Sequence, residues 1–204
     1  MRRGVKRLRP ANYVDKLECL IDLQTLTIEG HIDLFYGDES GFSLIPVVPY
    51  GWQAADHALE RTSQASRRLN VLAWIDQAGH LVSFTSPVSV NSQFVISCVE
   101  EWVLSLSRPT VLVLDNAPMH RSKAFQACFE RWQQAGLYIF FLPAYSPHLN
   151  KVECLWRKIK YEWLDTAAYT SYESLTQAVK AILAEFGTKY TIRFTQNHSI
   201  INSV

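Results

Sequence analysis

The sequence lacks the features that mark several classes of protein. Its 20 basic and 19 acidic residues leave a net charge of only +1, so the overall charge indicates no particular partner. No apolar run approaches the roughly 20 residues that a membrane-spanning helix needs. The basic start is not followed by the apolar segment of a secretory signal. We therefore expect a cytoplasmic protein that does not act at a membrane.

Cysteine is also scarce, and its spacing excludes two further classes. The four cysteines contain no CxxC pair; they are Cys19, Cys98, Cys128 and Cys154. Because Cys128 and Cys154 fall among apolar neighbours of predicted helices, they are typical of reduced, buried thiols. This pattern argues against a disulfide framework and against a zinc site.

What is present is an ordinary globular composition with unevenly distributed charge. At 204 residues and 48% hydrophobic content, the chain can build one core with small appendages. Five of the first ten residues are basic, and this arm could lie along phosphates or could simply be a solvated terminus. We divide the chain into a basic arm and linker at 1–28, one globular domain at 29–195 and a C-terminal tail at 196–204.

Periodicity and turn signals predict alternating strands and helices after a short helix at 13–23. A turn at 39–41 would join the first two strands as an antiparallel hairpin. Strands are expected at 32–38, 42–48, 71–75, 111–114 and 138–142, with a short partner strand at 81–84. Helices are expected at 92–106, 122–134, 151–164 and 172–186. This order predicts an α/β fold, with a mixed five-stranded sheet flanked by helices.

Two of the predicted strands stop at an acidic residue. Strand 32–38 ends on Asp38, and Asp115 follows strand 111–114. The first and fourth strands of a mixed sheet can be neighbours, which would bring these carboxylates to adjacent strand ends. Glu39 points to the other face of an extended chain, so we expect Asp38 to be the inward acid. Taken alone, Asp115 is equally well explained as a loop aspartate or a helix cap.

A third acid, Glu153, opens the predicted helix 151–164. From the first helical turn its carboxylate could project towards a site beside the strand ends. The sequence Asn150-x-x-Glu153 also fits a capping box, in which the glutamate bonds back to the cap residue. The spacing leaves both interpretations open.

Three carboxylates on neighbouring elements would suit divalent cations, because hard cations prefer oxygen ligands. Two Mg²⁺ ions bound by Asp38, Asp115 and Glu153 could activate a hydroxyl and stabilise the leaving oxygen in a phosphoryl transfer. The neighbours that could position these acids are Asn116, His120 and Asn150. His120 could instead contact a phosphate or be a structural histidine at a helix start.

Phosphate transfer also needs cations close to the acids. Each candidate is equally well explained as part of a solvated helix face. The candidates are Arg121, Lys123, Lys151, Arg157, Lys158 and Lys160.

Three blocks of the sequence resemble the signature blocks of DDE transposases. They are Asp38-Glu39-Ser40-Gly41-Phe42, the stretch from Leu114 to Lys123, and the stretch LPAYSPHLNKVECLW from Leu142 to Trp156. In this order they are most similar to the bacterial insertion-sequence branch of the mariner-like superfamily. The resemblance extends from residue 33 to residue 194.

The resemblance implies a ribonuclease H-like DDE catalytic domain at 29–195. It implies that Asp38, Asp115 and Glu153 bind two Mg²⁺ ions, for which Mn²⁺ can substitute. The implied reaction is DNA transposition, with strand cleavage at transposon ends followed by transfer of the 3′-hydroxyl into target DNA. The implied partners are DNA, a second copy of the chain on that DNA, and an upstream helix-turn-helix chain or reading frame. The location would be bacterial and nucleoid-associated.

Two other functions stay open on the sequence. A plain nuclease of the same fold would hydrolyse DNA without joining strands. A non-catalytic DNA-binding or assembly protein derived from a transposase would not need the three acids, and their presence argues against it.

Overall fold

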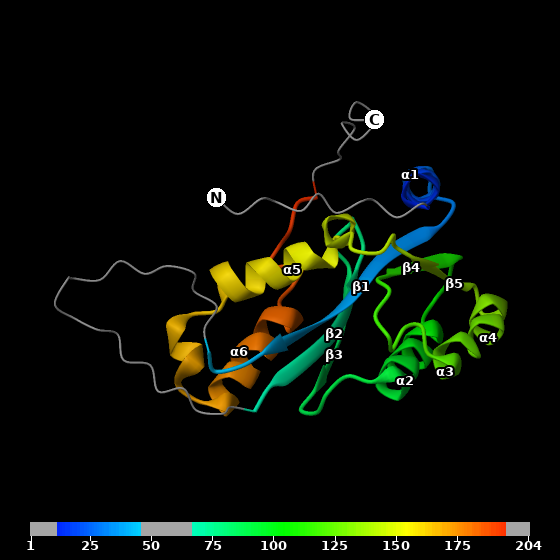
Figure 1. Ribbon diagram of the computed structural model, residues 1–204. Helices are drawn as coiled ribbons and strands as arrows, with labels where there is room; N and C mark the ends of the chain where they lie inside the picture. The colour runs from blue at the N-terminus through cyan, green and yellow to red at the C-terminus, as the bar shows by residue number, and fades with distance from the viewer. Residues whose placement is uncertain (1–11, 46–66, 195–204) are drawn as a thin grey trace, which may run out of the picture.

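A computed structural model describes residues 12–45 and 67–194 of the chain (Figure 1). The basic residues before position 12, the end of the predicted strand 42–48 and the predicted tail lie outside these ranges. The described elements are, in order, α1 (Tyr13–Ile28), β1 (Asp33–Phe42), β2 (Leu69–Ile75), β3 (Leu81–Ser86), α2 (Ser92–Val103), β4 (Thr110–Leu114), α3 (Lys123–Gln126), α4 (Phe129–Gln134), β5 (Leu137–Phe141), η1 (Pro147–Leu149), α5 (Val152–Lys158), η2 (Ile159–Trp163), η3 (Thr166–Thr170) and α6 (Tyr172–Ala184).

The strands form one five-stranded sheet in the order β3-β2-β1-β4-β5. β1 pairs antiparallel with β2 and parallel with β4, while β2–β3 is antiparallel and β4–β5 is parallel. The predicted mixed sheet flanked by helices is therefore confirmed. Its central strand is β1, which joins the antiparallel and the parallel halves.

The predicted hairpin at the start of the sheet is wrong. β1 continues through Glu39, Ser40 and Gly41 to Phe42, and each of these residues has a partner in β2. Pairing with β2 satisfies backbone groups that a turn would have left to local bonds, so tertiary context overrides the turn signal. The Arg68 guanidinium fills the space where a Cβ at Gly41 would lie. The fifth strand is β3, which was expected only as a short partner.

Helices cover both faces of the sheet (Figure 1). α2, α3 and α4 bury Trp102, Phe125 and Trp132 against one face, where Trp74 and Leu114 also lie. α5 and α6 cover the opposite face over β1 and β2. Among the helices that the structure describes, none is long and apolar enough to cross a membrane.

Two predicted helices differ from those observed. The helix expected at 122–134 is divided into α3 and α4 around Cys128, whose N–H bonds to Phe125 O three residues back. The helix expected at 151–164 changes after Lys158 into the wider π-helix η2. The other expected helices are confirmed, with ends that shift by a few residues.

α1 lies inside the segment that we had assigned to an arm and linker, a division that stays a prediction. Its Leu20 is only 2% exposed and packs into a third cluster with Leu34, Tyr36, Val111 and Val113. These strand residues share the sheet face that α5 and α6 cover farther along β1 and β2. α1 therefore covers the part of this face that lies over β1 and β4.

β1 is longer than β4, and this brings two of the acids together. The parallel register pairs Asp33 with Thr110 and Tyr36 with Val113, so each partner lies 77 positions later (110 − 33). Continuing the same offset brings Asp38 beside Asp115, the first residue after β4. Asp38 therefore lies inside β1 and not at its end as predicted.

Because α1 packs against the sheet, substitutions on its buried side should lower the free energy of unfolding. Leu20→Ala should lower the free energy of unfolding by about 2–4 kcal/mol, because it empties a buried site. Leu26→Ala is the matched control on the same helix, since Leu26 is 38% exposed and should cost less than about 1 kcal/mol. Urea unfolding followed by circular dichroism measures both. Equal effects of the two substitutions would show that α1 is not part of the cooperative core.

Candidate active site

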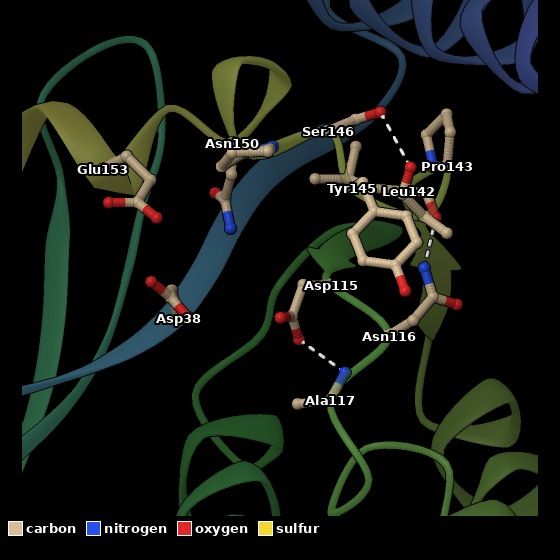
Figure 2. A pocket seen from close by; sticks show the side chains of 12 residues that line it. Asp38, Asp115, Asn116, Ala117, Leu142, Pro143, Tyr145, Ser146, Asn150 and Glu153 are labelled. Carbon is tan, nitrogen blue, oxygen red and sulfur yellow. Dashed lines mark hydrogen bonds between the residues drawn. The ribbon is translucent and has the colours of Figure 1, made fainter. Parts of the chain in front are cut away.

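An open pocket of about 370 Å³ lies beyond the end of β4, and all three predicted acids line it (Figure 2). Asp38 comes from β1, Asp115 follows β4, and Glu153 comes from the first turn of α5. The other lining residues are Asn116, Ala117, Leu142, Pro143, Ala144, Tyr145, Ser146, Pro147 and Asn150. The structure thus brings together residues more than 100 positions apart in the sequence.

Asp38 is largely buried, and its carboxylate is difficult to ionise. Burial raises its pKa to about 8, with further contributions from the negative charges of Glu39, Glu153 and Asp115. Trp156 on α5 donates its Nε1–H to Asp38 Oδ2 at 3.2 Å. This bond fixes the orientation of the carboxylate, and sequence analysis missed it because Trp156 also fits the apolar stripe of its helix.

Asp115 is held by its own loop. The Ala117 N–H and His120 Nδ1 each lie 2.9 Å from Asp115 Oδ1. Burial opposes ionisation of Asp115, but these bonds outweigh burial and hold the pKa below its ordinary value. Both hydrogen bonds that the described residues make to the Asp115 carboxylate end on Oδ1. The second oxygen, Oδ2, is therefore available to a ligand.

His120 links Asp115 to the other face of the sheet. Its ring is fully buried against Phe125, and its Nε2 lies 3.9 Å from Glu39 Oε2. Within the described part of the chain, neither of these two atoms has a hydrogen-bond partner. Burial raises the pKa of Glu39, although His120 opposes this effect. Glu39 therefore does not line the pocket, and His120 lies between the Glu39 carboxylate and the Asp115 carboxylate, which does.

Glu153 is exposed and does not form the capping box. The Asn150 N–H that a capping-box glutamate would bind donates instead to Pro147 O at 2.9 Å. The buried Asn150 side chain donates from Nδ2 to Gly37 O at 2.9 Å and accepts from the Val152 N–H at 3.4 Å. Asn150 thereby ties the start of α5 to β1 immediately before Asp38, which leaves Glu153 pointing into the pocket.

The loop opposite these acids is anchored at its start. Asn116 Nδ2 donates to Leu142 O at 2.6 Å, and Lys16 of α1 donates to Phe141 O at 2.7 Å and Leu142 O at 3.3 Å. Burial, followed by the charge of Arg121, lowers the pKa of Lys16. No sequence signal singled out Lys16, because its partners are backbone carbonyls more than 120 positions away.

Of the six predicted cations, Lys160 lies close to two of the acids, and Arg121 contacts a residue that lines the pocket. Burial, followed by the charge of Arg68, lowers the pKa of Lys160, although Glu153 and Asp38 lie close enough to oppose this. Lys160 Nζ also lies 5.4 Å from the centre of the Phe42 ring. Arg121 donates to Oδ1 of Asn116, a residue that lines the pocket, at 3.2 Å.

The other four cations are placed less directly. Lys151 Nζ lies 5.8 Å and 5.5 Å from the ring centres of Tyr36 and Phe194, and burial lowers its pKa. Lys158 forms an ion pair with Glu162. Side chains of the remaining two, Lys123 and Arg157, are exposed.

The donor set fits a hard divalent cation, but the three carboxylates are not yet gathered around one point. Figure 2 shows the Asp38 and Glu153 carboxylates turned towards each other and the Asp115 carboxylate turned towards Ala117. As the side chains lie, no group of three histidine, cysteine, aspartate or glutamate residues in the described ranges could hold one ion. Only oxygen donors face the pocket from the acids, and a cation there would offset the burial and the like-charge repulsion that together raise the pKa of Asp38.

Solved structures of other proteins resemble this fold. The Mos1 strand transfer complex aligns with a TM-score of 0.59 and 18% identity, over 91% of this chain and 60% of that chain. The catalytic domain of Mos1 mariner transposase gives 0.54 and 19%, over 88% and 85%. The magnesium complex of the HTLV-2 integrase catalytic core gives 0.50 and 16%, over 78% and 88%. These likenesses confirm the predicted ribonuclease H-like fold.

The chain spans about 60% of the length of the Mos1 chain in the strand transfer complex. A search of curated proteins with the sequence gave no match. A family model described as DDE superfamily endonuclease matches residues 33–176, which is well over half of the sequence. The bacterial insertion-sequence branch stays a prediction, but the chain belongs to the DDE superfamily of endonucleases.

Proposed function

We propose that this chain is the catalytic domain of a DNA transposase, which cleaves strands at transposon ends and joins the freed 3′-hydroxyl to target DNA. The observation that carries the proposal is the convergence of Asp38, Asp115 and Glu153 on one pocket of a DDE endonuclease. Solved Mos1 relatives include strand transfer and paired-end complexes, which supports DNA as the substrate.

Asp38, Asp115 and Glu153 would hold two Mg²⁺ ions, and Mn²⁺ would substitute, as Mos1 complexes with Mg and with Mn suggest. Bound there, the ions would activate a water or a 3′-hydroxyl and stabilise the leaving oxygen. Trp156 orients Asp38, and His120 and the Ala117 N–H orient Asp115.

Other residues of the chain would position DNA. Lys160, close to Glu153 and Asp38, and Arg121, bonded to Asn116, would bind phosphates of the DNA backbone. Lys123 and Arg157 are exposed and can extend this contact. The resemblance to mariner-like transposases also leads us to propose a homodimer on DNA and an upstream helix-turn-helix chain that reads the transposon ends.

Replacing the acids by their amides tests the proposed reaction. Asp38→Asn, Asp115→Asn and Glu153→Gln should each reduce Mg²⁺-dependent nicking of supercoiled plasmid at least about 100-fold, because each removes an anionic ligand. Glu162→Gln is the matched control. Glu162 is an exposed glutamate in η2, directly after α5, and it forms an ion pair with Lys158. Nicking retained by Glu153→Gln would remove Glu153 from the reaction.

The same assay separates transposase from plain nuclease when a short duplex with a free 3′-hydroxyl is added. A transposase should join the duplex to the plasmid, and a nuclease should only nick it. A chain that binds plasmid without either product would support the non-catalytic assembly protein.

The raised pKa of Asp38 predicts how pH and metal act on stability. Since the folded pKa is about 8 and the ordinary value is 3.8, the folded state retains a proton that the unfolded chain releases between these values. The stability contributed by Asp38 is therefore present at low pH and is lost as pH rises towards 8. In EDTA at pH 8, Asp38→Asn should have a higher Tm than the unmutated chain. Calorimetry should also show that Mg²⁺ raises the Tm of the unmutated chain more than that of the variant, and the opposite ranking would refute the metal site.

A further inference from the structure

Glu39 follows the first acid directly in the sequence but does not line the pocket. Successive side chains of an extended strand point to opposite faces, so Asp38 reaches the pocket and Glu39 points to the other face of β1. The Glu39 side chain is 27% exposed, yet its Oε2 is buried and has no hydrogen-bond partner among the described residues. A carboxylate oxygen that loses its hydration in this way needs a partner to offset the cost.

A ring nitrogen of His120 lies close to this oxygen and has the same need. His120 is fully buried, and its Nε2 lies 3.9 Å from Glu39 Oε2, without a hydrogen-bond partner in the described ranges. Because an N–H···O bond spans about 2.9 Å, a shift of about 1 Å would satisfy both atoms together. The Glu39 side chain is flexible and partly exposed and can make this shift, whereas the His120 ring packs against Phe125.

The loop after β4 holds the His120 ring between two carboxylates. The N–H groups of His120 and Arg121 both donate to Ala117 O, at 3.0 and 3.2 Å, and this turn brings the ring back to Asp115. There His120 Nδ1 lies 2.9 Å from Asp115 Oδ1. One imidazole ring therefore has one nitrogen beside Asp115 and the other beside Glu39.

The orientation of this ring determines how Asp115 presents its carboxylate to the pocket. Both the Ala117 N–H and His120 lie against Oδ1, which leaves Oδ2 for a ligand. Removing groups that orient a metal ligand in this way commonly lowers metal affinity by about 10- to 100-fold. A group that fixes the second nitrogen of the ring would therefore also fix the carboxylate of Asp115.

We propose that Glu39 is a positioning residue of the metal site, which forms a hydrogen bond with His120 Nε2 and so fixes the Asp115 carboxylate from the opposite face of the sheet. The inference rests on the proposed function, because it assumes that Asp115 binds a divalent cation. Glu39 touches neither the ion nor DNA in this role. Since a side-chain amide can either donate or accept, glutamine can replace Glu39, but a side chain without polar atoms cannot.

Binding of Mn²⁺ alone to the full chain tests this role without DNA and without turnover. Free Mn²⁺ is measured by electron paramagnetic resonance, and Asp115→Asn serves as the reference for loss of the site. Glu39→Leu should bind Mn²⁺ about 10-fold more weakly than the unmutated chain, because the Asp115 carboxylate is no longer fixed. Glu39→Gln should bind like the unmutated chain, although it removes the same negative charge.

A double-mutant cycle shows whether Glu39 acts through His120. His120→Asn keeps a side-chain N–H that can take the place of Nδ1 beside Asp115, but it has no atom in the place of Nε2. In this background Glu39→Leu should cause no further loss of Mn²⁺ affinity, since the interaction is already absent. Asp33→Asn is the control at the other end of β1 and should leave the affinity unchanged.

Thermal unfolding in EDTA separates positioning from a structural role. Glu39→Leu should have a Tm equal to or above that of the unmutated chain, since it removes a buried carboxylate oxygen that has no partner among the described residues. Weaker Mn²⁺ binding without a lower Tm supports positioning. A Tm that falls together with the Mn²⁺ affinity would make Glu39 a structural residue.

Three Mn²⁺ results would also overturn the inference. They are equal affinity of Glu39→Leu and the unmutated chain, equal loss in Glu39→Gln and Glu39→Leu, and a further loss from Glu39→Leu in the His120→Asn background. Failure of the proposed function has a different signature. If the metal site is wrong, Asp115→Asn binds Mn²⁺ as the unmutated chain does, and the inference falls with it. If only the reaction is wrong, the Mn²⁺ results hold as expected, but Mg²⁺ yields neither nicked nor joined plasmid.

Discussion

The parallel register between β1 and β4 is the constraint on which the site depends. It is set by the core, since Leu112 and Leu114 pack where Gly37 has no side chain, and a Cβ there would lie 2.9 Å from Leu114 Cδ2. A shift by one residue would exchange the two faces of the strand and bury the wrong set of side chains. The hydrophobic face therefore fixes the register, and the register fixes Asp38 beside Asp115.

The third acid depends on a separate, polar link. Glu153 stands on α5, which reaches the sheet only after the loop from Leu142 to Asn150. The Asn150 side-chain amide holds the start of α5 to the sheet by donating a hydrogen bond to Gly37 O. The same glycine is therefore contacted by core leucine side chains and by the residue that positions α5. Because both contacts converge one residue before Asp38, they place all three acids relative to a single point of β1.

The sequence was sufficient to predict what local pattern determines. Apolar runs and turn residues predicted most of the strands and the sheet type, and the alternation of an extended chain placed Asp38, and not Glu39, on the side of the pocket. What the sequence could not predict depends on residues far away. The turn at 39–41 was wrong because β2 pairs with it, Trp156 looked like core although it also bonds to Asp38, and Lys16 bonds to backbone that carries no side-chain signal.

Several features that cost stability lie around the pocket. Asp38 is largely buried next to other acids, the Nε2 of His120 and a carboxylate oxygen of Glu39 are buried without hydrogen-bond partners among the described residues, and Tyr145 occupies a strained conformation. Each feature would be removed by a simple substitution, such as asparagine at Asp38 or glycine at Tyr145, with a gain in stability. A protein that served only as a DNA-binding scaffold would have no reason to retain them. Their location beside the three acids favours a pocket maintained for reaction.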